Sequence, residues 1–545
     1  MIKRDLGKQV RRMVCSFLVL SLFQGLSAQS FLRTSGKDIV DGDGNKILLR
    51  GVGLGNWMLP EGYMWKFGKG GDRPRKIEKI VDDCIGHEKA DKFWKSYREN
   101  YITEADIKKI AELGYNSVRP ALNSRLFLTE GDNNIFVDEG FTLLDNLISW
   151  CKKYRIYVII DMHGAPGGQT GQNIDDSPND EPELFMKPKN QYLLERLWVK
   201  IANRYKDEPI VAAFDLLNEP LPEHTGAAEK YKHQLVPLYK RLIKAIRAVD
   251  KNHMFTVEGY NWSNNWSLFD IPLDNNIVYQ FHYYCWSKPD NLNSINQYLV
   301  KQQQLNVPVW VGETGEKNNA IYFATTQYFE KNNIGWSFWP WKKMATINTP
   351  YSIKMPNGWS DIMAYSEGGA KTISKVAAEK IFDELIENIK LINCNYFPDV
   401  VNAMFRTIPL RVEAENYGDD GYLKSYFVKD TVLKSAFYRT KESIQVNPFG
   451  KDSTEQAINL AKSEWVVYNC NALKQSLNNV TMHAKALSKT VEIRLSINGK
   501  DTDLKIESNK WQDLNVNDQP FKTGENQIKV FVKTGNMQLD WIYIQ

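Results

Sequence analysis

Two glutamates, Glu219 and Glu313, each follow a short apolar run of the kind that forms a buried strand. Residues 210–214 lead through Asn218 to Glu219, and residues 307–312 lead directly to Glu313. An ionised carboxylate is costly inside a strand, so each glutamate is expected at the open end of its strand. Two carboxyl groups flanking one glycosidic bond are what its hydrolysis requires. If the two strands share a sheet, these glutamates form such a pair.

The segments that must position this pair alternate between strand-like and helix-like patterns from residue 47 to residue 391. Repeated βα units favour a parallel α/β sheet, and eight of them favour a (β/α)8 TIM barrel; a doubly wound sheet is the alternative. Strands are predicted at 47–53, 115–119, 156–162, 210–218, 254–259, 277–284, 307–312 and 334–339. Polar residues end nearly all of them, which suits the C-terminal rim of a barrel, where active sites lie. These strand-end residues are Arg119, His163, Glu219, Glu258, His282, Glu313 and Trp339.

The pattern changes beyond residue 409, where short strand-like segments follow one another without a helical period. These segments are 410–415, 465–469, 480–484, 490–497, 527–532 and 537–544. They predict an all-β sandwich over residues 410–545. The expected domains are therefore a barrel over 31–395, a linker or packing segment over 396–409 and the sandwich.

Residues 1–28 have the pattern of a secretory signal peptide. Five basic residues precede the apolar run 13–23, and Ala28 is the small residue at the expected cleavage site. This run is far shorter than the roughly 20 residues of a membrane span. The protein is therefore expected to be secreted or periplasmic, without an integral membrane span.

Charge and cysteine content exclude several other classes. The formal net charge of +4 becomes 0 when the signal segment, with five basic residues and Asp5, is removed. A nucleic-acid partner or an anionic membrane surface therefore has no electrostatic support. The five remaining cysteines are widely spaced and contain no Cys-x-x-Cys, so neither a disulfide framework nor a zinc site is expected.

The strand-end residues, taken in order, resemble a known family. Asn218–Glu219–Pro220, His282–Tyr283–Tyr284 and Gly312–Glu313, together with Arg119, His163 and Trp339, are similar to the family 5 glycoside hydrolases of the large retaining (β/α)8 clan. The resemblance covers residues 31–395. It implies that Glu219 is the general acid/base and Glu313 the nucleophile. It also implies a set of substrate-binding residues, which are Arg119, His163, Asn218, His282, Tyr284 and Trp339.

In this resemblance Arg119 and Tyr284 hold Glu313, Asn218 binds the sugar 2-hydroxyl, and Trp339 is the stacking floor. The pKa values that the two roles require support the same assignment of the two glutamates. A nucleophile must stay ionised, and the charge of Arg119 lowers the pKa of Glu313. The acid needs a raised pKa, which the negative charge of Glu313 supplies for Glu219.

The substrate is indicated by two loops. Residues 163–169 and 53–57 are similar to the exo-β-1,3-glucanase branch of the family, whereas the insertion over 60–97 departs from it. This insertion carries Tyr63 and Trp65, and we expect it to wall one side of the cleft and favour exo action. The expected function is a retaining β-glycosidase acting on β-glucan or β-glucosides, with a β-linked oligo- or polysaccharide as partner. A β-mannan or a glucolipid is the alternative substrate, and a non-catalytic glycan-binding protein is the alternative class.

The sandwich has its own resemblance. Residues 412–417 at its start and 539–542 at its end are similar to family 6 carbohydrate-binding modules. That family's structural calcium site would map onto Glu413, Glu415 and Asp540, and oxygen-only ligands suit calcium. Tyr438 is the best remaining candidate for a platform under a sugar ring, and the alternative is a structural accessory domain that has lost sugar binding. No cofactor is expected for catalysis.

Overall fold

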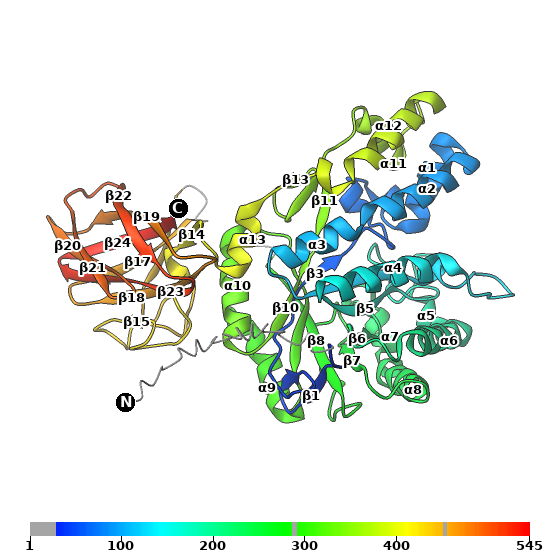
Figure 1. The fold of residues 1–545 in the computed structure, drawn as a ribbon, viewed down its shortest axis with the longest axis horizontal. Helices are drawn as coiled ribbons and strands as arrows, with labels where there is room; N and C mark the ends of the chain where they lie inside the picture. The colour runs from blue at the N-terminus through cyan, green and yellow to red at the C-terminus, as the bar shows by residue number, and fades with distance from the viewer. Residues whose placement is uncertain (1–28, 286–291, 451–454) are drawn as a thin grey trace, which may run out of the picture.

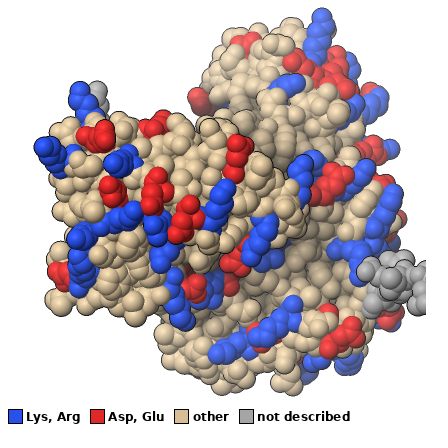
Figure 2. Space-filling model, turned by 60° about the vertical axis from the view of Figure 1, so that its left-hand side comes forward, with Lys and Arg blue, Asp and Glu red and all other residues tan. Residues whose placement is uncertain are grey.

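The computed structural model describes residues 29–285, 292–450 and 455–545, and Figure 1 shows a barrel and a β-sandwich joined through helical elements. The expected signal peptide, residues 1–28, lies outside the described residues. No helix in the described ranges is long and apolar enough to cross a bilayer. On the face drawn in Figure 2, basic and acidic side chains are interspersed over both parts of the molecule.

Eight parallel strands close into a barrel in the order β10-β3-β4-β5-β6-β7-β8-β9. The pairing of β10 with β3 closes the ring, which confirms the barrel and excludes the doubly wound alternative. All eight predicted strands are present. Their bounds are β3 (Arg50–Leu54), β4 (Ser117–Asn123), β5 (Tyr157–Gly164), β6 (Val211–Asp215), β7 (Met254–Glu258), β8 (Ile277–Tyr284), β9 (Val309–Gly315) and β10 (Gly335–Trp339).

Helices surround the strands because each has one apolar face. In α4 (Asp138–Tyr154) the residues at helical spacing, Leu144, Leu147 and Cys151, are buried. Thr103 caps α3 through a capping box with Asp106, whose carboxylate accepts the Thr103 N–H at 2.9 Å. The other main helices are α3 (Glu104–Glu112), α6 (Pro188–Tyr205), α8 (Leu235–Arg247), α9 (Asn296–Leu305), α10 (Asn319–Lys331) and α12 (Lys375–Asn388).

The insertion after β3 folds into η1 (Gly62–Trp65), η2 (Lys69–Gly71), α1 (Pro74–Ile85) and α2 (His87–Tyr101). Trp65 is only 1% exposed. Its ring packs against Trp94, Tyr97 and Trp359, and its Nε1 donates to Asn56 at 2.8 Å. The expectation that Trp65 faces the cleft is therefore wrong, because the ring completes an apolar cluster between the insertion and the end of the barrel.

The segment 396–409, expected to be a linker or a packing segment, contains a packed helix, α13 (Pro398–Phe405). The main-chain oxygen of Met404 accepts the hydroxyl of Thr326 at 2.8 Å, and Arg406 pairs with Glu330 at 2.6 Å. Phe405 packs edge-on to Tyr115 of the barrel at 4.9 Å. The segment is thus part of the barrel wall rather than a tether.

The sandwich consists of two antiparallel sheets, β16-β17-β24-β19-β22 with β14 on β24, and β15-β18-β23-β20-β21. In β20 buried residues alternate with partly exposed ones, as a sheet with one buried face requires. Phe323 of α10 is 1% exposed and packs into the sandwich core. The helix therefore contributes side chains to the sandwich as well as to the barrel, and Figure 1 shows it between the two. The strands are β14 (Leu410–Glu413), β15 (Tyr426–Phe427), β16 (Val446–Phe449), β17 (Glu455–Ala461), β18 (Trp465–Ala472), β19 (Ser476–Ala486), β20 (Val491–Ile497), β21 (Lys500–Ile506), β22 (Gln512–Phe521), β23 (Gly524–Thr534) and β24 (Asn536–Ile544).

Candidate active site

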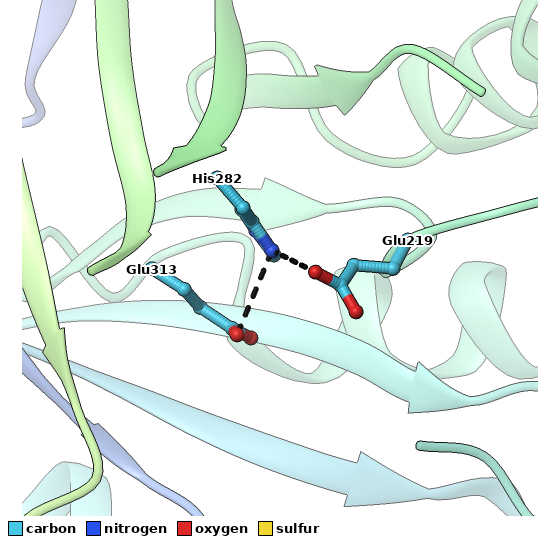
Figure 3. Close-up of side chains that lie close together, drawn as sticks. All are labelled: Glu219, His282 and Glu313. Carbon is cyan, nitrogen blue, oxygen red and sulfur yellow. Dashed lines mark hydrogen bonds and ion pairs between the residues drawn. The ribbon is translucent and has the colours of Figure 1, made fainter. Parts of the chain in front are cut away.

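The two glutamates meet at the C-terminal rim, where β6 and β9 end. One oxygen of Glu219, one oxygen of Glu313 and a ring nitrogen of His282 all lie within 4.8 Å of one another. Figure 3 shows His282 pointing between the two carboxylates. An inverting pair leaves about 6.5–9.5 Å for a water, whereas a retaining pair stands about 5–5.5 Å apart. The observed spacing is that of the closer arrangement.

Glu313 is held as an anion. Arg119 Nη1 lies 2.6 Å from its Oε1, and the Tyr284 hydroxyl donates to its Oε2 at 2.7 Å. Burial alone would raise the pKa of this carboxyl, but the positive charges of His282 and Arg119 outweigh burial and leave the pKa below its ordinary value. The preceding Gly312 is required, since a Cβ there would lie 1.8 Å from the side chain of Gln280.

The pKa of Glu219 is shifted in the opposite direction. Burial, with help from the charges of Glu313 and Glu258, raises its pKa, although the charge of His282 opposes this shift. His282 Nδ1 lies 2.7 Å from Glu219 Oε1. The backbone of Glu219 has φ +44°, a left-handed conformation that is uncommon for a residue with a side chain, and its N–H donates to Glu258 at 2.7 Å. Burial is therefore the first cause of the raised pKa, ahead of the Glu313 charge expected from the sequence.

His282 stands among three carboxylates. Burial would lower the pKa of the imidazole, but Glu258, Glu313 and Glu219 together raise it well above its ordinary value. Glu258, the other strand-end carboxylate, is fully buried and lies 3.4 Å from His282 Nε2. It therefore lies behind the pair rather than in the position of a second nucleophile.

A buried arginine organises the rear of the site. Arg119 is 0% exposed, and besides Glu313 it binds Asp215 and Asn218, each at 2.8 Å. It also lies 3.3 Å from Asp161, whose other oxygen holds His163 Nδ1 at 2.7 Å. Neither aspartate was predicted as a site residue, although Asp215 ends β6 and Asp161 lies three residues before the end of β5. Because they neutralise and orient Arg119 and His163, both belong to the site.

Trp339, at the end of β10, packs behind the carboxylate pair. Its ring stacks on His163 at 5.2 Å with planes 6° apart, and its Nε1 donates to the Tyr63 hydroxyl at 3.2 Å. Glycines are needed at positions 53 and 55 because a Cβ there would come within 2.2 and 2.5 Å of the indole. Trp339 is only 3% exposed, so most of its surface is already covered by protein.

A cavity of about 680 Å³ opens in front of the pair. Of the residues expected from the sequence, Glu219, Glu313, His282 and Tyr284 line it, and the insertion adds Tyr63. The four other expected residues do not line this cavity and are nearly or fully buried behind the pair; they are Arg119, His163, Asn218 and Trp339.

Glu61 is a further carboxylate of this region that sequence reasoning missed. It is 2% exposed, and its Oε1 has no hydrogen-bond partner among the described residues. Burial raises its pKa well above the ordinary value, and the charges of Glu313 and Glu219 add to this shift. The sequence signal was its place between Pro60 and Gly62, at the start of the insertion that follows the first barrel strand.

Two acidic groups could attract a cation. The first is the triad of Glu219, His282 and Glu313, but both oxygens of Glu313 are already hydrogen-bonded to Arg119 and Tyr284. The second lies in the sandwich, where Glu413, Glu415 and Asp540 line one cavity with the start of α10.

The second group fits a cation by its chemistry. Glu415 is 6% exposed, and its Oε2 has no partner among the described residues. Burial, followed by the charge of Glu413, raises the pKa of Asp540 to about 7. Glu413 itself is paired with Arg411 at 2.7 Å. Tyr438 lines the same cavity but is 4% exposed and packs in the sandwich core, so the expectation of a sugar platform there is wrong.

Comparison with known proteins points to one family. Residues 83–345 match the model described as cellulase (glycosyl hydrolase family 5). The match spans just under half of the chain and includes the barrel strands β4 to β10. A β-xylosidase of Phanerodontia chrysosporium is 27% identical to the chain over 363 residues, 59% of this chain and 74% of that protein. Endoglucanase C of Acetivibrio thermocellus is 33% identical over 197 residues, 35% of this chain and 53% of that protein.

Other matches cover between half of the chain and nearly all of it. A probable glucan 1,3-beta-glucosidase A of Aspergillus fumigatus is 26% identical over 279 residues, 50% of this chain and 64% of that protein. The crystal structure of a β-glucanase from Saccharophagus degradans covers 66% of this chain and 94% of its own, with 18% identity and a TM-score of 0.42. The crystal structure of an endogalactoceramidase covers 94% of this chain and 99% of its own, with 14% identity and a TM-score of 0.44. The chain spans about half the length of the endoglucanase and about three quarters of the xylosidase.

Proposed function

We propose that this glycoside hydrolase is a retaining β-glycosidase that cleaves β-glucan or β-glucosides. One observation carries the proposal: two buried carboxyl groups at one rim lie close together, and their pKa values are shifted in opposite directions. A deprotonated Glu313 and a protonated Glu219 are the two states that the first step of a double displacement needs.

In the first step Glu313 attacks the anomeric carbon, and the bond to the leaving oxygen breaks as Glu219 gives its proton to that oxygen. The glycosyl ester removes the charge of Glu313, and with it one of the contributions that raise the pKa of Glu219. Glu219 then takes a proton from water, which attacks the same carbon and releases Glu313. Arg119 and Tyr284 hold the departing carboxylate in place between the steps.

Glucose-containing substrates are supported by the matched proteins whose names include endoglucanase and glucan 1,3-beta-glucosidase. Exo action is supported by the insertion, which places Tyr63 in the cavity wall. A wall at this end favours binding of a chain terminus over the middle of a chain. The non-catalytic alternative is disfavoured because the charged network around the pair is complete.

The remaining parts of the proposal concern the whole chain. The protein is secreted or periplasmic, in keeping with the signal pattern of residues 1–28. The sandwich is a module of the family 6 carbohydrate-binding type that takes a structural calcium ion at Glu413, Glu415 and Asp540. When bound, such an ion would supply positive charge to the unpartnered oxygen of Glu415. Catalysis uses no cofactor.

The test is hydrolysis of β-1,3-, β-1,4- and β-1,6-linked gluco-oligosaccharides, with a mannan series beside them, followed by product sizing. NMR during the first turnovers should show the β-anomer, and glucose or one short unit should be the first product from a long glucan. Glu313→Gln is the blank for contaminating activity. An α-anomer as first product would overturn the retaining mechanism, and an early ladder of oligosaccharides would overturn exo action.

A further inference from the structure

A second hollow, larger than the catalytic cavity, lies on the flank of the barrel. Its volume is about 1030 Å³, and it is lined by the insertion helices α1 and α2, by the barrel helix α4 and by η3 (Ser124–Leu126). These helices can be followed in Figure 1. None of the residues that line this flank groove also lines the catalytic cavity. The insertion therefore shapes two separate hollows, with Tyr63 of η1 in the wall of one and helix α2 in the wall of the other.

The floor of the flank groove is apolar. It consists of four buried residues, which are Ala90, Trp94, Leu126 and Leu143. The Nε1 of Trp94 has no hydrogen-bond partner among the described residues, which is uncommon for a buried polar atom. A hydroxyl oxygen brought to the floor by a ligand is the kind of acceptor that this donor lacks.

Ion pairs fix the polar side chains around this floor. Arg98 lies over the Trp94 ring, 5.6 Å from its centroid, and pairs with Glu139 at 2.6 Å. Arg125 pairs with Glu78 at 2.9 Å. The first pair joins α2 to α4 and the second joins η3 to α1, so the rim is held in place before any ligand binds.

The charges of the groove point to an uncharged ligand. Among its lining residues the carboxylates nearly balance the lysines and arginines, so a strongly charged ligand would find little net attraction. Thr142 and Asn146, both exposed and one turn apart on α4, add uncharged hydrogen-bonding groups to the rim. An apolar floor below a polar rim suits a ligand with flat apolar faces and hydroxyl edges. A neutral oligosaccharide has this chemistry.

We infer that the flank groove is a second carbohydrate-binding site, which takes a stretch of β-glucan outside the catalytic cavity. This inference rests on the proposed β-glucan function and adds a second point of attachment for a polymeric substrate. Attachment at one place raises the effective concentration of the same polymer at the other. The benefit is confined to long substrates, because a short one fills only one of the two sites.

The kinetic experiment blocks the groove from its exposed rim. Thr142→Trp places a large side chain in the opening without altering the buried floor. It should lower kcat/KM on a long β-glucan by about tenfold, the low end of what attachment at a second site contributes in other systems. The rate on an aryl β-glucoside should stay unchanged, and that rate also reports that the variant is folded. Asn146→Ala should show a smaller loss of the same kind.

The matched control is Ser149→Trp, which adds the same side chain at an exposed position of α4 outside the groove. It should behave as wild type on both substrates.

Binding is measured separately from hydrolysis. Enzyme that carries a 2-deoxy-2-fluoroglucosyl group in its catalytic cavity cannot turn over, and its retention in affinity gels reports binding elsewhere. The gels contain laminarin, barley β-glucan or pustulan, which differ in linkage. At least one of these polymers should retain the blocked wild type and Ser149→Trp, whereas Thr142→Trp should migrate faster in the same gel.

Two results would overturn the inference. If Thr142→Trp matches wild type in retention and in polymer hydrolysis, the groove does not bind glucan and is left to another class of ligand, such as a peptide. Equal losses on the polymer and the aryl glucoside would mean that the substitution acts on the catalytic cavity. Failure of the proposed function is distinguishable, because wild type itself would then cleave none of these glucans and form no adduct, and the inference would fall with it.

Discussion

The carboxylate of Glu258 accepts the backbone N–H of Glu219 at 2.7 Å. This bond fixes the left-handed backbone from which the Glu219 side chain reaches the cavity. The same carboxylate lies 3.4 Å from His282, which in turn contacts the Glu219 side chain. Glu258 thus contacts the proposed acid directly at its N–H and indirectly through His282. It does not line the cavity, and we regard it as a positioning residue.

Replacing Glu258 by glutamine should shift the pH profile of kcat/KM. The wild-type basic limb reports loss of the proton of Glu219 and should lie above the ordinary glutamate value of about 4.3, while the acid limb of Glu313 should lie below it. The amide that replaces the carboxylate can still accept the N–H, but one negative charge that raises the Glu219 pKa is gone. His282 keeps its other two carboxylate neighbours and should stay charged. The basic limb should therefore move to lower pH.

The control for this shift is Glu229→Gln, which removes an exposed charge on α7 (Ala227–Tyr231). Its pH profile should match wild type. A basic limb that stays in place or moves to higher pH in Glu258→Gln would contradict the role given to Glu258.

Glu313→Gln should lower kcat by roughly 10⁴- to 10⁶-fold, the loss typical of removing a nucleophile. The measurement that assigns the residue is independent of this loss. A 2-deoxy-2-fluoro β-glucosyl substrate should leave a covalent adduct on wild-type enzyme, and peptide mapping should find it on Glu313. An adduct on Glu258 or Glu61 would refute the assignment.

Phe323→Ala should uncouple the sandwich from the barrel. Truncation of a buried phenylalanine costs about 3–5 kcal/mol of unfolding free energy. Because Phe323 belongs to α10 but packs in the sandwich core, calorimetry should show one transition splitting into two. Phe329→Ala, on the face of the same helix that packs in the barrel core, is the matched control and should lower stability without this separation. A single unsplit transition in Phe323→Ala would argue that other contacts join the two bodies.

Calcium should stabilise the sandwich. An ion present at about 100 times its Kd stabilises the folded state by about 2.7 kcal/mol, enough to raise Tm by roughly 5 °C or more. Addition of EDTA should reverse this shift, and Glu415→Gln should abolish it. Glu525→Gln, an exposed position on β23, should respond to calcium as wild type does. A wild-type Tm that does not depend on calcium would exclude the site.

The barrel could be predicted from the sequence because its strands are apolar runs that end in polar residues. Glu219 and Glu313 are examples, since local pattern places each at a strand end and the closed sheet then brings both to one rim. The sandwich could be predicted as an all-β domain for a related reason. In strands such as β20, buried residues alternate with partly exposed ones.

The features that could not be predicted depend on contacts between segments far apart in the sequence. Trp65 was expected in the cleft because it follows the first strand, yet its ring is covered by Trp359, almost 300 residues further along. The sequence of residues 396–409 leaves a linker and a packing segment equally open, and only the structure shows that α13 buries Val401 and Met404. Glu61 could not be predicted as a site residue for the same reason, because its nearness to Glu313 arises only when the barrel closes.

The position of Phe323 has a consequence for ancestry. A family 5 barrel that never carried this sandwich would expose residue 323 on the outer surface of α10, where a large apolar side chain would favour aggregation. Relatives without the second body should therefore carry a polar or small residue at the equivalent site. A phenylalanine there would mark, in genomic sequences alone, which barrels have been inherited together with a docked sandwich and which have not.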